Sequence, residues 1–213
     1  MTEYFTNLIL YIFFIYFCTG SFAVIPPVLQ HLPALEHLKL NSNRMSHIVG
    51  IRHLTLLKTL NLSGNSLRSL PRDFGDLVNL EKLFVQCNKL GVLPASIARL
   101  TKLQLLNIGN NGLVAFPPEI GHLVSLNSLR CEYNALSSLP PEIGSLRALT
   151  TFILCDNPEL HTLPAEMGNL AALTSLDIGH VQLHSLPATM ARLTQLKSLT
   201  LPESAPIERP LGV

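Results

Sequence analysis

The chain has no tryptophan, and aromatic residues of all kinds make up only 6% of its 213 residues. Of the 9 Phe and 4 Tyr residues, 8 lie before residue 23, so the rest of the chain has very few aromatic side chains for a core. That core must therefore be assembled from aliphatic side chains used repeatedly. Charged residues are also scarce, at 14% of the chain against about 25% in globular proteins.

No excess of basic residues is present, since 15 Lys and Arg face 14 Asp and Glu, and no basic run occurs. Nucleic-acid-binding proteins usually carry such an excess, so we expect no nucleic-acid partner. The chain also has no C-x-x-C pair, no glycine-rich phosphate loop and no nucleophile elbow. We therefore predict that it is not an enzyme, has no catalytic residues and needs no cofactor.

What the chain does have is an internal repeat, the feature to seek first in a leucine-rich sequence. The pattern L-x-x-L-x-L-x-x-N-x-L recurs at steps of 22 to 24 residues. Its units begin at Leu35, Leu57, Leu80, Leu103, Leu126, Leu149, Leu173 and Leu196. Six units keep the asparagine, at Asn43, Asn65, Asn88, Asn111, Asn134 and Asn157. Behind most units comes a Leu-Pro or Phe-Pro pair and then an I-G-x-L-like stretch, as in residues 116–123.

Each part of a unit has a structural interpretation. Leu129 and Cys131 alternate with polar neighbours, which predicts a half-buried strand. Asn134 brings two donors and one acceptor into the following turn, where it can satisfy backbone groups of adjacent coils. The next proline ends the extended stretch, and Ile143 and Leu146 share one face of a short helical turn. One unit cannot bury its leucines alone, but a stack of seven or eight forms a continuous core.

These motifs resemble the leucine-rich repeat family over about residues 22–203. The 23-residue spacing with L-P-x-x-I-G-x-L-x-x-L is most similar to the Ras-suppressor-type and Scribble-type subgroup, shared by plant intracellular relatives. The resemblance implies an α/β fold, a curved solenoid with a parallel sheet on the concave face and short helical or irregular segments on the convex face. It also implies a signalling scaffold that docks another protein there, such as a small GTPase or a phosphatase subunit.

Some units depart from the pattern. The unit from Leu35 lacks the Leu-Pro pair, and its apolar residues, three apart, predict a more helical back. The unit from Leu149 has one extra residue near Pro158, which predicts a local bulge in the turn. Val181 stands where the next unit should have its asparagine, so the asparagine ladder should break there. The last unit stops after Leu201 and runs into a Pro-containing tail.

Residues 8–17 are all apolar or aromatic, and three interpretations of this start are open. A signal peptide would have a suitable apolar region and a small-residue exit at Gly20 or Ala23. A membrane anchor would use residues 8–25, at the lower limit of length. Both lack the expected basic flank, because no Lys or Arg precedes Lys39. Membrane association is expected only through these residues.

The third interpretation is a divergent first repeat, or a start of the protein sequence that was predicted wrongly. Ile12, Ile15 and Phe17 fall in register with the leucines of the repeat, and Gly20 replaces the asparagine. We accordingly divide the chain into an apolar segment (1–21), a solenoid (22–203) and a Pro-containing tail (204–213).

Cysteine usage bears on the compartment. Extracellular leucine-rich repeat proteins usually bracket the solenoid with disulfide-bonded caps, and no such cluster of cysteines is seen here. Scattered thiols suit a reducing compartment, so we predict a cytoplasmic protein, with secretion or membrane anchoring as the alternative.

One position of successive coils carries residue types that can bind a metal ion. Asp156, His180 and Glu203 occupy equivalent positions about 5 Å apart, where they could chelate a divalent ion. A solvated polar strip explains the same residues more simply, and we predict no metal site.

The residue between the two strand leucines of each unit should point to the concave face. Phe84 and Ile153 are apolar where water is expected, and Arg130 and the nearby Tyr133 are of types enriched in binding hot spots. The sequence therefore predicts a protein-docking patch centred on these four residues. The full predicted face consists of Lys39, Asn61, Phe84, Asn107, Arg130, Tyr133, Ile153 and Asp177.

The leading functional hypothesis is a non-catalytic interaction scaffold or regulatory subunit in intracellular signalling. A secreted or membrane-tethered recognition protein is the first alternative. A fragment of a larger receptor or enzyme is the second, which the unfinished last repeat favours.

Overall fold

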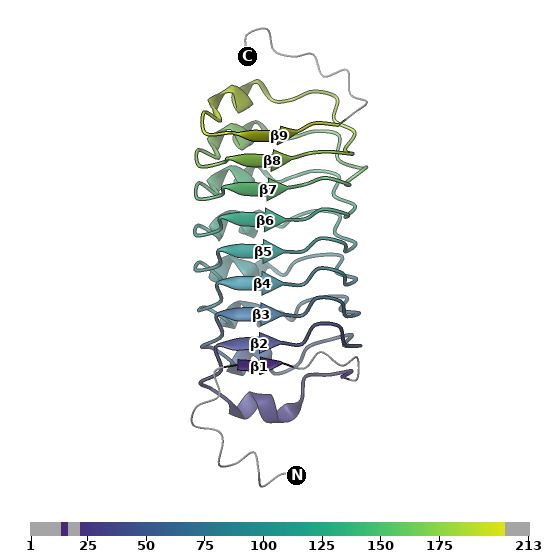
Figure 1. Ribbon diagram of the computed structural model, residues 1–213, viewed down its shortest axis with the longest axis vertical. Coiled ribbons are helices and arrows are strands. Elements are labelled where there is room, and N and C mark those ends of the chain that lie inside the picture. The colour runs from purple at the N-terminus through teal and green to yellow at the C-terminus, as the bar shows by residue number, and fades with distance from the viewer. Residues whose placement is uncertain (1–13, 17–21, 203–213) are drawn as a thin grey trace.

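The computed structural model describes residues 14–16 and 22–202. Nine short strands form one parallel sheet in strict chain order, stacked as successive rungs along the long axis of the molecule (Figure 1). The strands are β1 (Phe14–Tyr16), β2 (His37–Lys39), β3 (Thr59–Asn61), β4 (Lys82–Phe84), β5 (Leu105–Asn107), β6 (Ser128–Arg130), β7 (Thr151–Ile153), β8 (Ser175–Asp177) and β9 (Ser198–Thr200).

Among the described residues, one short 3₁₀ helix lies between each pair of consecutive strands. The helices are η1 (Pro27–His31), η2 (Ile51–His53), η3 (Phe74–Asp76), η4 (Ala95–Arg99), η5 (Pro118–His122), η6 (Pro141–Ser145), η7 (Ala165–Asn169) and η8 (Ala188–Arg192). This alternation confirms the predicted α/β solenoid. Among the described residues, no helix has both the length and the apolar character that a membrane crossing demands.

Proline sets the start of most of these helices. Pro140 holds φ −71° and ψ 147° just before η6, an extended conformation from which the helix turns away. The N–H of Leu146 then closes η6 by donating to the carbonyl of Ile143. The predicted division into a strand, a proline-initiated return and a short helical turn is therefore what the chain adopts.

The core lies between the sheet and the helices. In β2 to β8 the middle residue of each strand is buried and its two neighbours are more exposed, as a period of two requires. Leucines from the turns and from most strands meet isoleucines and other apolar residues of the 3₁₀ helices inside, and Phe74 and Phe152 are the largest fully buried side chains. Cys131 is completely buried at a leucine position, as predicted.

The back of the solenoid is packed too closely for side chains at some positions. A Cβ atom on Gly121 would lie 2.7 Å from the carbonyl oxygen of Glu142 in the next coil. Gly144 has the same relation to the carbonyl oxygen of Glu166. The glycine of the I-G-x-L stretch therefore allows neighbouring 3₁₀ helices to approach closely.

The prediction of a more helical back in the unit from Leu35 is wrong. Its only helix is η2, with three residues, whereas η4 to η8 have five each. Gly50 takes a left-handed φ of 75° directly before η2. A longer helix cannot continue through that conformation, and the missing proline leaves no earlier start point.

Strand β1 pairs with β2 in parallel, and Ile15 lies opposite Leu38. This is the register that the divergent-repeat interpretation assigns to Ile15. The other residues of that interpretation, Ile12, Phe17 and Gly20, lie outside the described residues.

Candidate protein-docking face

The predicted face forms a continuous row on the sheet. The third residue of each strand is the register partner of the third residue in the next strand from β2 to β9. We call this the central row: Lys39, Asn61, Phe84, Asn107, Arg130, Ile153, Asp177 and Thr200. Arg130 and Thr200 are exposed and the other six residues are half-buried. The structure thus brings every predicted strand residue of the face into one line.

A second row on the same face was missed at the sequence level. It consists of the first residue of each strand: His37, Thr59, Lys82, Leu105, Ser128, Thr151, Ser175 and Ser198. Leu105 is a half-buried apolar residue and the diagonal neighbour of Phe84, since Lys82 pairs with Leu105 and Phe84 with Asn107. The same period of two that placed the central row could have found it, on the other side of each buried leucine.

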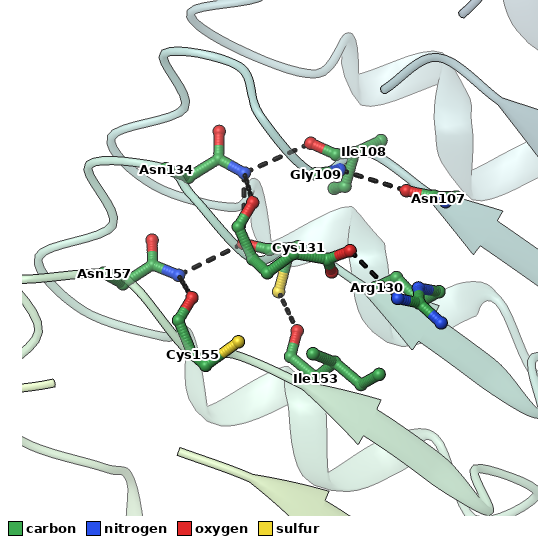
Figure 2. A network of polar contacts seen from close by, with 10 residues as sticks. Asn107, Ile108, Gly109, Arg130, Cys131, Asn134, Ile153, Cys155 and Asn157 are labelled. Atoms are coloured by element: carbon green, nitrogen blue, oxygen red, sulfur yellow. Dashed lines mark hydrogen bonds and ion pairs between the residues drawn. The ribbon is translucent and has the colours of Figure 1, made fainter. Parts of the chain in front are cut away.

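An asparagine ladder holds the coils in register beside this face. The N–H of Leu113 donates to Asn134 Oδ1 at 3.0 Å. Asn134 Nδ2 in turn donates to the carbonyls of Ile108 and Cys131 at 3.1 and 3.0 Å. The arrangement is repeated at Asn157, whose Nδ2 donates to the carbonyls of Cys131 and Leu154; Figure 2 shows its bond to Cys131. Each asparagine therefore joins its own coil to the preceding one, as predicted.

The ladder stops at Val181, which is 3% exposed. In the regular coils the N–H two residues after one asparagine donates to the next asparagine, as Leu136 donates to Asn157. The equivalent N–H of Leu160 has no asparagine to meet and donates to the carbonyl of Asn157 at 3.0 Å instead. The extra residue near Pro158 makes this local turn, so the insertion compensates in part for the missing asparagine.

The residue before each ladder position has a positive φ, a feature the repeat pattern did not reveal. Non-glycine residues rarely adopt this conformation, yet here it recurs in every coil from Ser42 to His180. Tyr133 belongs to this set, with φ 55° and 59% of its surface exposed. The positions are Ser42, Gly64, Cys87, Asn110, Tyr133, Asp156 and His180.

Glu132 lies between two of the predicted binding residues. Its Oε1 accepts from Arg130 Nη2 at 3.2 Å, and Figure 2 marks this ion pair by the dashed line that ends at Arg130. Its Oε2 is buried and accepts no hydrogen bond from the described residues. A Cβ on Gly109 in the preceding coil would lie 2.9 Å from Glu132 Cδ, so the glycine makes room for this carboxylate.

Negative charge dominates this end of the face. Burial raises the pKa of the Cys155 thiol to about 12, and the charges of Asp177 and Asp156 add to that effect. The charge of Asp156 is also the main cause of a raised pKa at the Tyr133 hydroxyl, and desolvation contributes. Both groups therefore report a negative potential.

The structure shows no metal-ligand set among the described members of the group Asp156, His180 and Glu203. Asp156 Oδ1 lies 3.0 Å from His180 Nδ1, and Glu203 is outside the described residues. Within the described part of the chain, no three His, Cys, Asp or Glu residues are grouped so that they could hold an ion.

Comparison with known proteins identifies the repeats. A family model described as a leucine-rich repeat region matches residues 15–133, more than half of the chain. A leucine-rich repeat protein of Leptospira interrogans superposes with a TM-score of 0.80 at 34% identity, covering 83% of this chain and 45% of that one.

Two receptor kinases are also similar. Over 64 residues the chain is 44% identical to the calmodulin-binding receptor kinase CaMRLK of Arabidopsis thaliana, which is 30% of this chain and 10% of the kinase. The Arabidopsis receptor kinase HAESA, solved with the peptide hormone IDA and the co-receptor SERK1, gives a TM-score of 0.76 at 27% identity. That match covers 88% of this chain and 33% of HAESA. The chain thus spans less than half the length of each of these three proteins.

Proposed function

Because the chain belongs to the leucine-rich repeat family, we propose that it is a non-catalytic interaction module whose concave face binds another protein. The observation that carries this proposal is the composition of the central row. Phe84 and Ile153 lie among polar residues on an open sheet face, and Arg130 and Tyr133 are exposed beside them. Such residues dominate binding energy when a partner covers them.

We assign the module to intracellular signalling in the cytoplasm, with a small GTPase or a phosphatase subunit as partner. Support comes from the free thiols of Cys87, Cys131 and Cys155, because a reducing compartment preserves such thiols. The proline-initiated 3₁₀ helices and the glycine contacts behind them agree with the 23-residue Ras-suppressor-type and Scribble-type repeats. We assign the chain to that subgroup on the same grounds.

A second candidate is the recognition region of a secreted or membrane-tethered receptor. The similarity to two receptor kinases favours it, one of them solved with a peptide hormone. Amino-terminal sequencing of the native protein separates the two candidates. A start near Gly20 or Ala23 would establish secretion, and an intact first segment would support the cytoplasmic assignment.

The docking proposal is tested with the double variant Phe84→Ala/Arg130→Ala. We expect it to lose at least 90% of partner capture in an affinity pull-down with mass spectrometry. The matched control is Val124→Ala/Arg147→Ala, which removes an exposed apolar and an exposed basic side chain away from the concave face. Circular dichroism at the assay temperature checks that both variants are folded. Equal capture by the two variants would exclude this patch as the docking site.

A further inference from the structure

The concave face changes in character along the solenoid. At β4 and β5 the half-buried side chains of Phe84 and Leu105 are diagonal neighbours, and we call this pair the apolar step. At β6 to β8 three carboxylates gather: Glu132, Asp156 and Asp177, which we call the acidic corner. A partner that covers this face must match both features.

The three acids belong to consecutive coils whose backbones remain paired beyond the strands. The N–H of Tyr133 donates to the carbonyl of Cys155 at 3.2 Å, and that of Asp156 donates to the carbonyl of Gly179 at 3.0 Å. Glu132, Cys155 and Gly179 therefore occupy equivalent places in three adjacent coils. Two of these residues are small, so no large side chain separates the acids. The raised pKa of Cys155 has contributions from all three carboxylates.

The protein's own cations neutralise the acidic corner only in part. Arg130 contacts one oxygen of Glu132, and His180 contacts one oxygen of Asp156. Asp177 Oδ1 accepts the backbone N–H of Gly179 at 3.0 Å, which adds no positive charge. Glu132 Oε2 is buried without a hydrogen-bond partner among the described residues. Within the part of the chain that the structure describes, the charge of Glu132 is therefore compensated only through the contact of its Oε1 with Arg130.

We propose that the concave face binds an extended segment of a partner protein, with an apolar residue on the apolar step and a Lys or Arg side chain at the acidic corner. This inference rests on the proposed docking function and specifies the partner's chemistry. Three strand spacings separate β4 from β7, about 14 Å at 4.8 Å each. An extended chain rises about 3.3 Å per residue, so the apolar and basic residues should lie about four or five positions apart.

Charge complementarity sets the selectivity of this surface. Three carboxylates against one arginine favour a basic segment and repel an acidic one of the same shape. Arg130 sits on the central row between the apolar step and the acidic corner. It can pair with Glu132 in the free protein and, since 44% of its side chain is exposed, turn to contact the partner when a competing cation takes its place.

The test is a selection of random 12-residue peptides displayed on phage, against the full chain and against its Glu132→Gln variant. We expect Lys or Arg to be enriched four or five positions from an apolar residue, and only with the unmodified protein. A synthetic peptide of the selected sequence is then measured by fluorescence anisotropy. Its affinity should fall at least tenfold with Glu132→Gln and with Asp177→Asn, whose amide oxygen can still accept the Gly179 N–H. The matched control, Glu142→Gln in η6 on the opposite side, should leave the affinity unchanged.

Three results would overturn the inference: selected peptides without a basic residue, binding that Glu132→Gln leaves unchanged, or no selected peptide at all. The docking function is judged separately by Phe84→Ala/Arg130→Ala. If peptides lose binding to that double variant but bind the Glu132→Gln variant as before, the docking face is supported and a cationic ligand is excluded. If neither the acidic-corner substitutions nor Phe84→Ala/Arg130→Ala weakens partner binding, this face is excluded as the docking site.

Discussion

At the scale of single residues, the ladder asparagines show why this fold needs a polar side chain inside an aliphatic core. Asn134 is 7% exposed and satisfies one N–H and two main carbonyls from two coils. A backbone bent through a turn at every coil leaves these groups without strand partners. An amide can meet both donors and acceptors at once, which no apolar residue can do.

We predict that Asn134→Ala lowers the free energy of unfolding by about 3 kcal/mol, because a buried N–H and carbonyls lose their partner. Urea unfolding followed by circular dichroism measures this change. The contrasting variant is Val181→Asn, which restores the asparagine at the break. Leu160 already has the Asn157 carbonyl as its acceptor, so we expect a gain of less than about 1 kcal/mol. A gain as large as the Asn134→Ala loss would contradict the compensating role of the inserted turn.

Residue types alone could not reveal this compensation. In the sequence, the missing asparagine at Val181 and the extra residue near Pro158 are two separate departures from the repeat pattern. They are related because the N–H of Leu160 is the group that the missing side chain should have met. Similarly, the repeat pattern assigns Tyr133 a place next to the ladder but says nothing of its φ of 55°. Both features depend on backbone geometry between coils.

At the scale of elements, the 3₁₀ helices are positioned by contacts between backbones. Gly121 in η5 faces the carbonyl oxygen of Glu142 in η6, and this close approach leaves no room for a methyl group. The five-residue helices have few hydrogen bonds of their own, so their stability must come from this packing. The I-G-x-L stretch, read in the sequence as an apolar pattern, thus also contains a steric requirement.

We therefore expect Gly121→Ala to lower the free energy of unfolding by about 2 kcal/mol through overpacking. Gly91 supplies the matched control, because a Cβ there meets nothing within 4 Å. Gly91→Ala should be neutral or slightly stabilising, by up to about 1 kcal/mol, since it reduces the entropy of the unfolded chain. Thermal and urea melts of the two variants test the difference. Equal effects would show that the helices can move apart at little cost.

At the scale of the whole molecule, the sequence predicts most of the architecture, and it places the strand residues of the proposed docking face in one row of the sheet. The period of about 23 residues predicts the stack of coils, and the period of two within each unit predicts the central row, including Phe84 and Arg130. Leu105, Glu132 and Asp156 were not recognised as parts of that face. Their significance lies in diagonal and inter-coil neighbours, which a one-dimensional pattern does not display.

Stability should fall toward the C-terminal coils, because a repeat array is approximately a sum of units and nearest-neighbour contacts. The asparagine ladder ends at Asn157, and the strand leucine Leu199 in β9 is 40% exposed, whereas Leu106 and Leu129 are fully buried. The inserted turn at Leu160 reduces the cost of the break. It does not replace the side-chain hydrogen bonds that an asparagine at position 181 would make between its own coil and the preceding one. We predict that residues from about Leu173 open before the centre does.

Native-state hydrogen exchange tests this at two equivalent amides. Ile108 donates to the carbonyl of Arg130 at 2.8 Å, and Ile178 donates to that of Thr200 at 3.0 Å. The geometry of the two bonds is alike, so any difference in exchange reports the opening of the surrounding coils. We expect the Ile178 amide to exchange at least tenfold faster than the Ile108 amide. Equal protection would mean that Val181 packs well enough to transmit the stability of the central coils to the last ones.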